Sequence, residues 1–161
     1  MTTEAQLANP GVKFPPPSLF LAGFGVAWLL ETYVRRIPIL RIGHTTTMEV
    51  LGTILIVLGF VMMFWGMLTF ARAKTAILPI RPASRIVDHG PYSFTRNPMY
   101  VGMSLAYFGG AFVMNSVWAL ILFPFVIALL SSLVIAREER YLSSAFGDDY
   151  DDYRKRVRRW L

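Results

Sequence analysis

Long apolar stretches without charged residues alternate with short polar segments along the chain. Residues 14–30 carry no charge, and neither do the 22 residues of 50–71 or the 40 residues of 97–136. The hydrocarbon core of a bilayer is about 30 Å thick, and a helix needs about 20 residues to cross it. The 50–71 stretch therefore predicts one span, and the 97–136 stretch is long enough for two. Residues 14–34, interrupted only by Glu31, predict a weaker first span.

The 40-residue stretch contains two breaks in its apolar pattern. Gly109–Gly110 comes first, and Asn115–Ser116 follows as the better turn, so two helices are expected to meet there in a tight hairpin. The chain is thus predicted to be an all-α integral membrane protein that forms a single domain, residues 1–161. Its four transmembrane helices are placed at about residues 18–34, 50–71, 98–114 and 117–136.

Neither a water-soluble fold nor a signal peptide fits the apolar segments as well as membrane spans do. A soluble protein with very apolar core helices needs a polar face on its outer helices, and residues 50–71 have none. A signal peptide has a basic start, a short apolar region and a small-residue cleavage site. The N-terminal region has one Lys, one Glu, a longer apolar part and no such site. Residues 1–17, polar and then Pro-rich, are expected to be a flexible lead-in.

The C-terminal segment, residues 137–161, has a different pattern. Its apolar residues recur at every third or fourth position, as on one face of a helix, and they are Leu142, Phe146, Tyr150, Tyr153, Val157 and Trp160. Gly147 is expected to break this amphipathic tail helix, and Asp148 to restart it as an N-cap. We expect the tail to lie along the cytoplasmic membrane face as an anchor, or to fold over a site there.

Basic residues are unevenly distributed between the two sides of this four-helix arrangement. The side that holds both termini and the 72–97 loop carries 13 of the 16 Lys and Arg residues, and the other side carries three. The positive-inside rule therefore predicts a multi-pass protein with both termini in the cytoplasm, in the inner membrane if it is bacterial. Topology and anionic headgroups account for the basic residues, so no nucleic acid partner is expected.

Several titratable positions predict structural roles or exclude chemistry. Glu31 lies near the end of the first span, four residues before Arg35, so an i,i+4 ion pair is expected there. The chain has no Cys, which excludes a disulfide framework, a thiolate metal site and a Cys nucleophile. The two His residues, His44 and His89, fall on opposite membrane sides in the predicted topology. No metal site is therefore predicted.

Residues 90–102, GPYSFTRNPMYVG, join an irregular, proline-rich loop to the third predicted span. The residue before a proline is driven out of the helical region, so Asn97 is expected to be extended and Pro98 to be the first helical residue. Free N–H groups at such a helix start attract carboxylates or phosphates, and Arg96 adds a full positive charge beside them. An ordinary capped helix, with an Arg reaching to the interface, is the alternative interpretation.

Glu138 and Glu139 follow the last predicted span directly, on the same membrane face as Asn97. Carboxylates at the mouth of a helix bundle can hold a cationic ligand, whereas a solvated helix end with i,i+4 ion pairs is the alternative. Together the two stretches predict a pocket that combines an anion-binding helix start, two carboxylates, and Tyr92 and Tyr100 nearby.

The succession of TRNPMYVG, an apolar hairpin and REERYL…FGDDYDDYRKRV resembles the isoprenylcysteine carboxyl methyltransferase and phospholipid methyltransferase superfamily. The pattern of that superfamily is Arg-His-Pro-x-Tyr-x-Gly, an apolar stretch, Glu-Glu and then Phe-Gly-x-x-Tyr. The likeness covers about residues 72–160. Asn97 departs from it, because eukaryotic members carry His there. Since Asn does not titrate near neutral pH, a general base is not carried over to this position.

The resemblance implies a membrane enzyme that moves a methyl group from S-adenosylmethionine to a lipophilic acceptor, such as a prenyl-cysteine-like carboxylate, a lipid amine or a hydrophobic thiol. One wall of the implied cofactor pocket comprises His89, Gly90, Tyr92, Arg96, Asn97, Pro98, Tyr100 and Gly102, and the other comprises Glu138 and Glu139. Arg137 and Glu138 are the candidate catalytic residues. The candidates for contacting the acceptor are Arg81, Arg85, Tyr150 and Tyr153.

Two other classes of function share parts of this pattern. Membrane sterol reductases, which use NADPH, resemble the superfamily in their C-terminal region. This chain is short for such a reductase and shows no Arg cluster for an adenine phosphate beyond the bases of the 72–97 loop. A non-catalytic membrane scaffold would use the tail to bind a partner. The sequence specifies neither the methyl acceptor nor the oligomeric state.

Overall fold

The computed structural model describes residues 10–12, 15–39, 46–75 and 83–161 of the chain. Within these residues all regular structure is helical, as the apolar pattern predicts. The α-helices are α1 (Pro16–Tyr33), α2 (Thr46–Arg72), α3 (Pro98–Val113), α4 (Val117–Leu130), α5 (Ala136–Phe146) and α6 (Asp148–Arg156). Two short elements complete the described fold, a 3-10 turn η2 (Gly90–Ser93) and a π-helical turn η3 (Ser131–Ile135).

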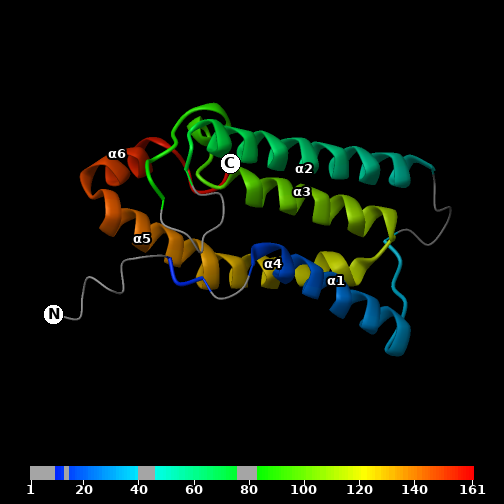
Figure 1. The fold of residues 1–161 in the computed structure, drawn as a ribbon. Coiled ribbons are helices and arrows are strands. Elements are labelled where there is room, and N and C mark those ends of the chain that lie inside the picture. Colours follow the sequence, from blue (N-terminus) through cyan, green and yellow to red (C-terminus); the bar gives the residue numbers. More distant parts are fainter. Residues whose placement is uncertain (1–9, 13–14, 40–45, 76–82) are drawn as a thin grey trace.

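The long helices form two pairs that run side by side, α2 with α3 and α1 with α4 (Figure 1). Glycines allow the first pair to approach closely. A Cβ on Gly59 would lie 2.5 Å from the carbonyl oxygen of Gly102, and a Cβ on Gly52 would lie 2.6 Å from that of Gly109. Small residues at such a contact are typical of helices that pack within membranes, where close van der Waals contact drives association. Gly102 therefore belongs to the α2–α3 contact.

The hairpin between α3 and α4 turns at the predicted residues. Asn115 adopts a positive φ of 53°, and the Ser116 hydroxyl accepts a hydrogen bond of 3.2 Å from the backbone N–H of Ala119. This capping bond satisfies one of the free N–H groups with which every helix begins. The predicted turn at Asn115–Ser116 is confirmed.

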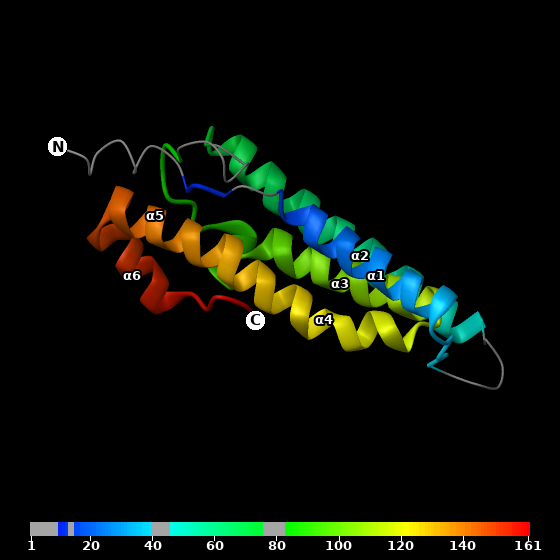
Figure 2. The same cartoon turned by 90° about the horizontal axis from the view of Figure 1, so that it is seen from below.

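The last long helix continues without a break from α4 through the π turn η3 into α5 (Figure 2). Single π-helical turns occur often next to functional sites, because the extra residue shifts which side chains face a neighbouring element. Here the π turn ends at Ile135, directly before the Arg137–Glu138–Glu139 segment. The fourth predicted span, 117–136, corresponds to α4 together with this turn.

Two of the described helical segments are long and apolar enough to cross a membrane, Thr46–Arg72 and Val117–Phe146. Large apolar side chains of α2, among them Phe60 and Phe64, are exposed on its outer face. Such side chains are stable facing lipid tails and costly facing water. Helices α1 and α3 have 18 and 16 residues. The number of four spans and the orientation of the termini therefore stay predictions.

The predicted ion pair between Glu31 and Arg35 is wrong. Helix α1 ends at Tyr33, so Arg35 lies beyond the last helical turn, where i,i+4 side chains no longer share a face. The backbone N–H of Arg35 instead bonds to the Leu30 carbonyl at 2.9 Å, and the Arg35 carbonyl accepts a bond of 2.7 Å from the Trp118 indole. The Oε1 atom of Glu31 is buried without a hydrogen-bond partner among the described residues.

The tail is broken at Gly147, as predicted, with a positive φ of 54°. Gly147 itself occupies the N-cap position and Asp148 is the first residue of α6, so the predicted cap at Asp148 is off by one residue. The apolar face folds back onto the protein. Tyr150, Tyr153 and Val157 cluster with Leu142, Phe146 and Ile86, and Trp160 packs against the helix bundle. The tail is therefore two helices and an extended end rather than one helix.

Candidate functional site

A pocket lies at the end of the bundle where α3 begins and α5 continues the last long helix. It encloses about 900 Å³ of space outside protein atoms, including its open mouth. The pocket is lined from the loop before α3, from the first turn of α3, from α5 and from α6. The two sequence motifs, whose residues Tyr100 and Glu138 are 38 positions apart along the chain, thus meet at one cavity.

Backbone geometry at Asn97 and Pro98 forms the first wall. Pro98 is the first residue of α3, as the sequence predicts, and Asn97 is outside the helical region, but its φ of −129° and ψ of 51° are not the extended conformation that we expected. The Asn97 side chain does not cap this helix; its Nδ2 donates a hydrogen bond of 2.9 Å to the carbonyl oxygen of Arg159. The Thr95 hydroxyl accepts a bond of 3.2 Å from the Asn97 backbone N–H. Asn97 is buried, so these bonds fix its orientation.

The side chain of Arg96 is buried at the pocket and only 11% exposed. Its Nη1 atom lies 3.2 Å from Glu139 Oε1, which makes an ion pair. Neither Nη1 nor Nε, however, has a partner in hydrogen-bonding geometry among the described residues. A buried guanidinium with unused N–H groups costs free energy until an acceptor satisfies it. Arg96 is therefore suited to bind an anionic group such as a carboxylate.

Glu138 lies on the opposite wall and accepts a hydrogen bond of 2.7 Å from the Tyr100 hydroxyl at Oε1. Burial raises the pKa of Glu138 to about 7; the Tyr100 bond acts in the lowering direction, and the charge of Glu139 raises the pKa. Glu138 is two residues beyond the predicted fourth span and lines the pocket. A carboxyl group with such a pKa exchanges its proton near neutral pH, and when ionised it can hold a cation.

Aromatic rings complete the pocket. Tyr92, Tyr100, Tyr150 and Tyr153 all line it, and the Tyr153 hydroxyl donates a bond of 2.8 Å to the Tyr92 carbonyl. The Tyr92 hydroxyl is buried without a partner among the described residues. Burial raises the pKa of both Tyr92 and Tyr153, so both remain neutral at physiological pH. Neutral tyrosine faces attract cationic groups, and an unpaired hydroxyl can bond a polar ligand.

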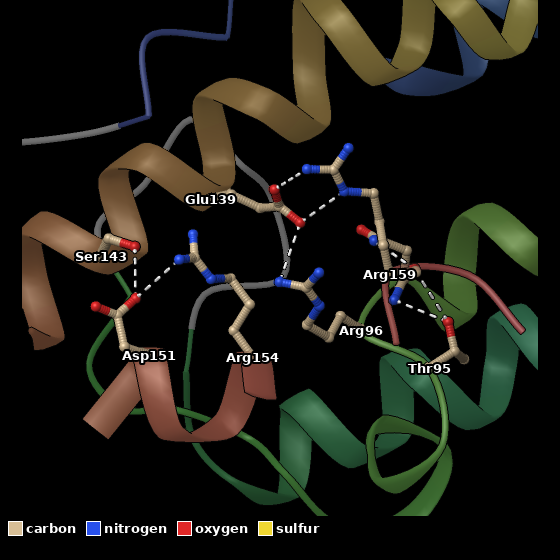
Figure 3. A network of polar contacts seen from close by, with 8 residues as sticks. Thr95, Arg96, Glu139, Ser143, Asp151, Arg154 and Arg159 are labelled. Carbon is tan, nitrogen blue, oxygen red and sulfur yellow. Dashed lines mark hydrogen bonds and ion pairs between the residues drawn. The ribbon is translucent and has the colours of Figure 1, made fainter. Parts of the chain in front are cut away.

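Glu139 lies between two arginines, Arg96 from the loop and Arg159 from the C-terminal end (Figure 3). Arg159 donates from Nε to Oε1 at 3.0 Å and from Nη2 to Oε2. Since both carboxylate oxygens are already engaged, Glu139 has less capacity for a ligand than Glu138. Sequence reasoning missed Arg159. Nothing local separates it from Arg158; only its place between the apolar tail residues Val157 and Trp160 marks this segment as packed.

The remaining candidate residues are distributed as follows. Arg85 lines the pocket, whereas Arg81 lies outside the described residues. Arg137 points toward the N-terminal segment and donates a bond of 2.8 Å to the Gly11 carbonyl. His89 is exposed, 3.9 Å from Asp88, and Gly90 packs with a positive φ against Thr69 and Trp65. Gly102 lies in the α2–α3 contact.

No group of three or more potential metal ligands occurs among the described residues. The charged and amide side chains of the pocket are instead Arg85, Arg96, Asn97, Glu138 and Glu139, and several tyrosines lie beside them. This set is suited to a ligand that carries both a negative and a positive charge together with an apolar or aromatic part.

A family model described as phospholipid methyltransferase matches residues 47–149. A protein-S-isoprenylcysteine O-methyltransferase of Schizosaccharomyces pombe is 38% identical over 72 residues, which are 45% of this chain and 30% of that protein. One from Saccharomyces cerevisiae is 30% identical over 115 residues, 70% of this chain and 48% of that protein. An uncharacterized protein of Haemophilus influenzae is 41% identical over 63 residues, 39% of this chain and 79% of that protein. The matches thus span less than half the length of these two methyltransferases.

Proposed function

The chain belongs to the phospholipid methyltransferase family, and from this premise we propose that it is an integral membrane enzyme that transfers a methyl group from S-adenosylmethionine to a lipophilic acceptor. The observation that carries the proposal is the pocket between Arg96 and Glu138. It joins a buried guanidinium, whose Nε and Nη1 make no hydrogen bond within the described part of the chain, a carboxylate and neutral tyrosines in one cavity.

The charged groups of S-adenosylmethionine match this arrangement. Arg96 would bind the carboxylate of its amino acid part, since neither Nε nor Nη1 donates a hydrogen bond to any residue that the structure describes. Glu138, when ionised, would hold the ammonium, and the rings of Tyr92 and Tyr150 would face the sulfonium. In this proposal Arg96 binds the anionic group, which the sequence analysis assigned to the start of the third span. Glu138 alone binds the cationic group, which the sequence analysis assigned to both Glu138 and Glu139. Glu139 supports them through its ion pairs with Arg96 and Arg159.

The donor, when bound, would supply a methyl group on a positively charged sulfur: the bond from the acceptor's lone pair to the methyl carbon would form as the carbon–sulfur bond breaks, and S-adenosylhomocysteine would leave as a neutral thioether. Such a reaction depends on positioning and on exclusion of water more than on a base. The protein provides the positioning through Arg96 and Glu138 at two walls of the pocket. Tyr150 and Tyr153 of α6 are buried and line the same pocket, and their rings would help to exclude water from it. Glu138 can also take up the proton that an amine or thiol acceptor releases.

The acceptor is proposed to be lipophilic and to approach sideways from the bilayer. Helix α2 exposes large apolar side chains along much of its outer face, and the pocket lies at the end of this same bundle. A polar donor can therefore enter from water while a lipid-anchored nucleophile arrives at the same depth between helices. On the basis of the positive-inside rule, we place the pocket and both termini on the cytoplasmic side.

Ligand-dependent stabilisation of the purified, full-length chain tests the proposal, since a ligand that binds only the folded state raises the unfolding temperature. We expect S-adenosylhomocysteine to stabilise the protein and NADPH to leave it unchanged. Stabilisation by NADPH alone would favour a reductase, and stabilisation by neither would favour a scaffold. Transfer of a radioactive methyl group from S-adenosylmethionine to a total lipid extract would then identify the class of acceptor.

A further inference from the structure

The C-terminal segment beyond α6 connects the two walls of the pocket through one residue. The carbonyl oxygen of Arg159 accepts hydrogen bonds from Asn97 Nδ2 at 2.9 Å and from the Thr95 hydroxyl at 3.3 Å. The guanidinium of the same residue binds both oxygens of Glu139 (Figure 3). The backbone N–H of Arg96 adds a bond of 2.9 Å to the Arg158 carbonyl. The loop before α3 and the start of α5 are therefore joined by the last residues of the chain.

Arg159 does not line the pocket, whereas Arg96 and Glu139 do. Glu139 is 12% exposed and lies between a buried guanidinium on the pocket side and the 44% exposed guanidinium of Arg159 on the outer side. The hydrogen bonds of Arg159 to residues that line the pocket are those with Glu139 and Asn97. We propose that Arg159 is a positioning residue for the cofactor pocket, which holds Glu139 and Asn97 in place and thereby keeps the donors of Arg96 available to the ligand.

The physical reason is competition for the carboxylate of Glu139. The planar fork of Arg159 matches a carboxylate and takes both oxygens. Arg96 is left with an ion-pair contact from Nη1 to one oxygen of Glu139, and neither its Nη1 nor its Nε makes a hydrogen bond among the described residues. Without Arg159, Glu139 would offer both oxygens to Arg96, and the N–H groups that we assign to the donor's carboxylate would turn toward Glu139. The inference rests on the proposed function, because it concerns the same pocket.

Arg159 also affects Glu138 indirectly. The charge of Glu139 raises the pKa of Glu138, and Arg159 partly neutralises that charge. Loss of Arg159 should therefore raise the pKa of Glu138 further and move the pH midpoint of ligand binding upward. A purely structural role of Arg159 would lower stability without moving this midpoint. The other charged and titratable groups around Glu138 are Tyr100, Tyr92 and Arg96, which the substitution leaves unchanged.

The test uses the full-length chain in detergent and measures S-adenosylhomocysteine affinity by calorimetry between pH 5.5 and 8.5. Arg159→Gln is expected to weaken binding about tenfold, the effect of losing one charged hydrogen bond, and to shift the midpoint to higher pH. Arg156→Gln is the matched control, since Arg156 is exposed in the same tail, pairs with Asp88 and carries the same charge. It should bind as the wild type does. In a protein that already carries Glu139→Gln, the further loss of S-adenosylhomocysteine affinity caused by Arg159→Gln should be much smaller than the loss that Arg159→Gln causes alone.

Wild-type affinity and an unchanged midpoint in Arg159→Gln would overturn the inference, and so would an undiminished effect in the Glu139→Gln background. If Arg159→Gln does not fold, Arg159→Lys decides, because it keeps the charge but loses the fork. It should bind more weakly than wild type at an unchanged midpoint, and wild-type affinity would count against the inference. Failure of the wild type itself to bind S-adenosylhomocysteine would instead refute the proposed function, and the inference with it.

Discussion

The Tyr100 hydroxyl donates a hydrogen bond of 2.7 Å to Glu138 Oε1 and thereby joins the first turn of α3 to α5. The two residues are 38 positions apart in the chain. Tyr100 belongs to the motif that binds an anion in our proposal, and Glu138 to the motif that binds a cation. This bond therefore couples the two halves of the candidate cofactor pocket.

Removal of the Glu138 charge should weaken donor binding. Glu138→Gln keeps the size of the side chain, and Gln can still accept the Tyr100 bond, but it cannot attract an ammonium. We expect the affinity for S-adenosylhomocysteine to fall by about 1 to 3 kcal/mol, the range for a hydrogen bond to a charged group. Asp152→Asn, at an exposed acid outside this pocket, is the control. Equal affinity of Glu138→Gln and wild type in calorimetry would remove Glu138 from the site.

The protonation of Glu138 should make binding depend on pH. Its folded-state pKa is raised to about 7 from 4.5, so the empty site is largely protonated at pH 6 and ionised at pH 8. Donor affinity is expected to rise through this interval. Stability of the empty protein should change in the opposite direction: between about 4.5 and 7 the folded state holds a proton that the unfolded state has lost, so stability falls as pH rises.

Two measurements check the pH dependence. Calorimetric titrations across pH should show a midpoint near 7 in the wild type. The hydrogen bond from Tyr100 stabilises the ionised form of Glu138, so its removal in Tyr100→Phe should raise the pKa of Glu138 and move the midpoint upward. Thermal unfolding of the empty protein across the same range should lose this pH-dependent component in Glu138→Gln. A flat affinity profile in the wild type would contradict the assignment of Glu138 to the cation.

The contact between α2 and α3 should be intolerant of even one methyl group. Gly59→Ala places a Cβ 2.5 Å from the Gly102 carbonyl oxygen and 2.8 Å from the Ala106 nitrogen, so the helices must move apart. We expect a loss of about 1 to 3 kcal/mol, typical of overpacking. Gly25→Ala in α1 is the control, because its Cβ meets nothing within 4 Å; it should be neutral or stabilising by up to about 1 kcal/mol. Thermal unfolding in one detergent would compare them, and equal midpoints would contradict the close contact.

The preference for a lipophilic acceptor can be tested with a matched pair of substrates. Both would carry the same reactive amine, thiol or carboxylate, and only one would carry a long alkyl or isoprenoid chain. Since each buried methylene contributes about 0.8 kcal/mol, the chain-bearing acceptor should have a much higher kcat/KM in nanodiscs. Equal values for the two acceptors would refute entry from the bilayer, even if methyl transfer itself were observed.

The predicted topology has its own test. Reporter fusions at each terminus and within the segment near Arg41 would show on which side of the membrane each lies. We expect both termini to report cytoplasmic and the Arg41 segment to report the opposite side, because 13 of the 16 basic residues lie on the side of the termini. A cytoplasmic signal from the Arg41 fusion would exclude the four-span arrangement.

The features that the sequence determined are those that depend on neighbouring residues. Uncharged apolar stretches predicted the long helices, Asn115–Ser116 predicted the hairpin, and Pro98 predicted where α3 begins. Gly147 likewise predicted the break in the tail. These predictions hold because helix periodicity, proline geometry and the conformational freedom of glycine act over a few residues. The residue types suited to a zwitterionic ligand were visible too, although not the distances between them.

Tertiary structure alone decided which charges pair. Glu31 and Arg35 have ideal helical spacing and yet do not pair, because α1 ends between them. Arg159, with no distinguishing local pattern, binds Glu139 20 positions away and Asn97 62 positions away. Glu138 and Glu139 are adjacent and chemically alike. Because Arg159 pairs with Glu139, we assign the cation of the ligand to Glu138. Ion pairs form where folding brings side chains together out of water, and their energies depend on burial and distance in three dimensions, which no local sequence pattern encodes.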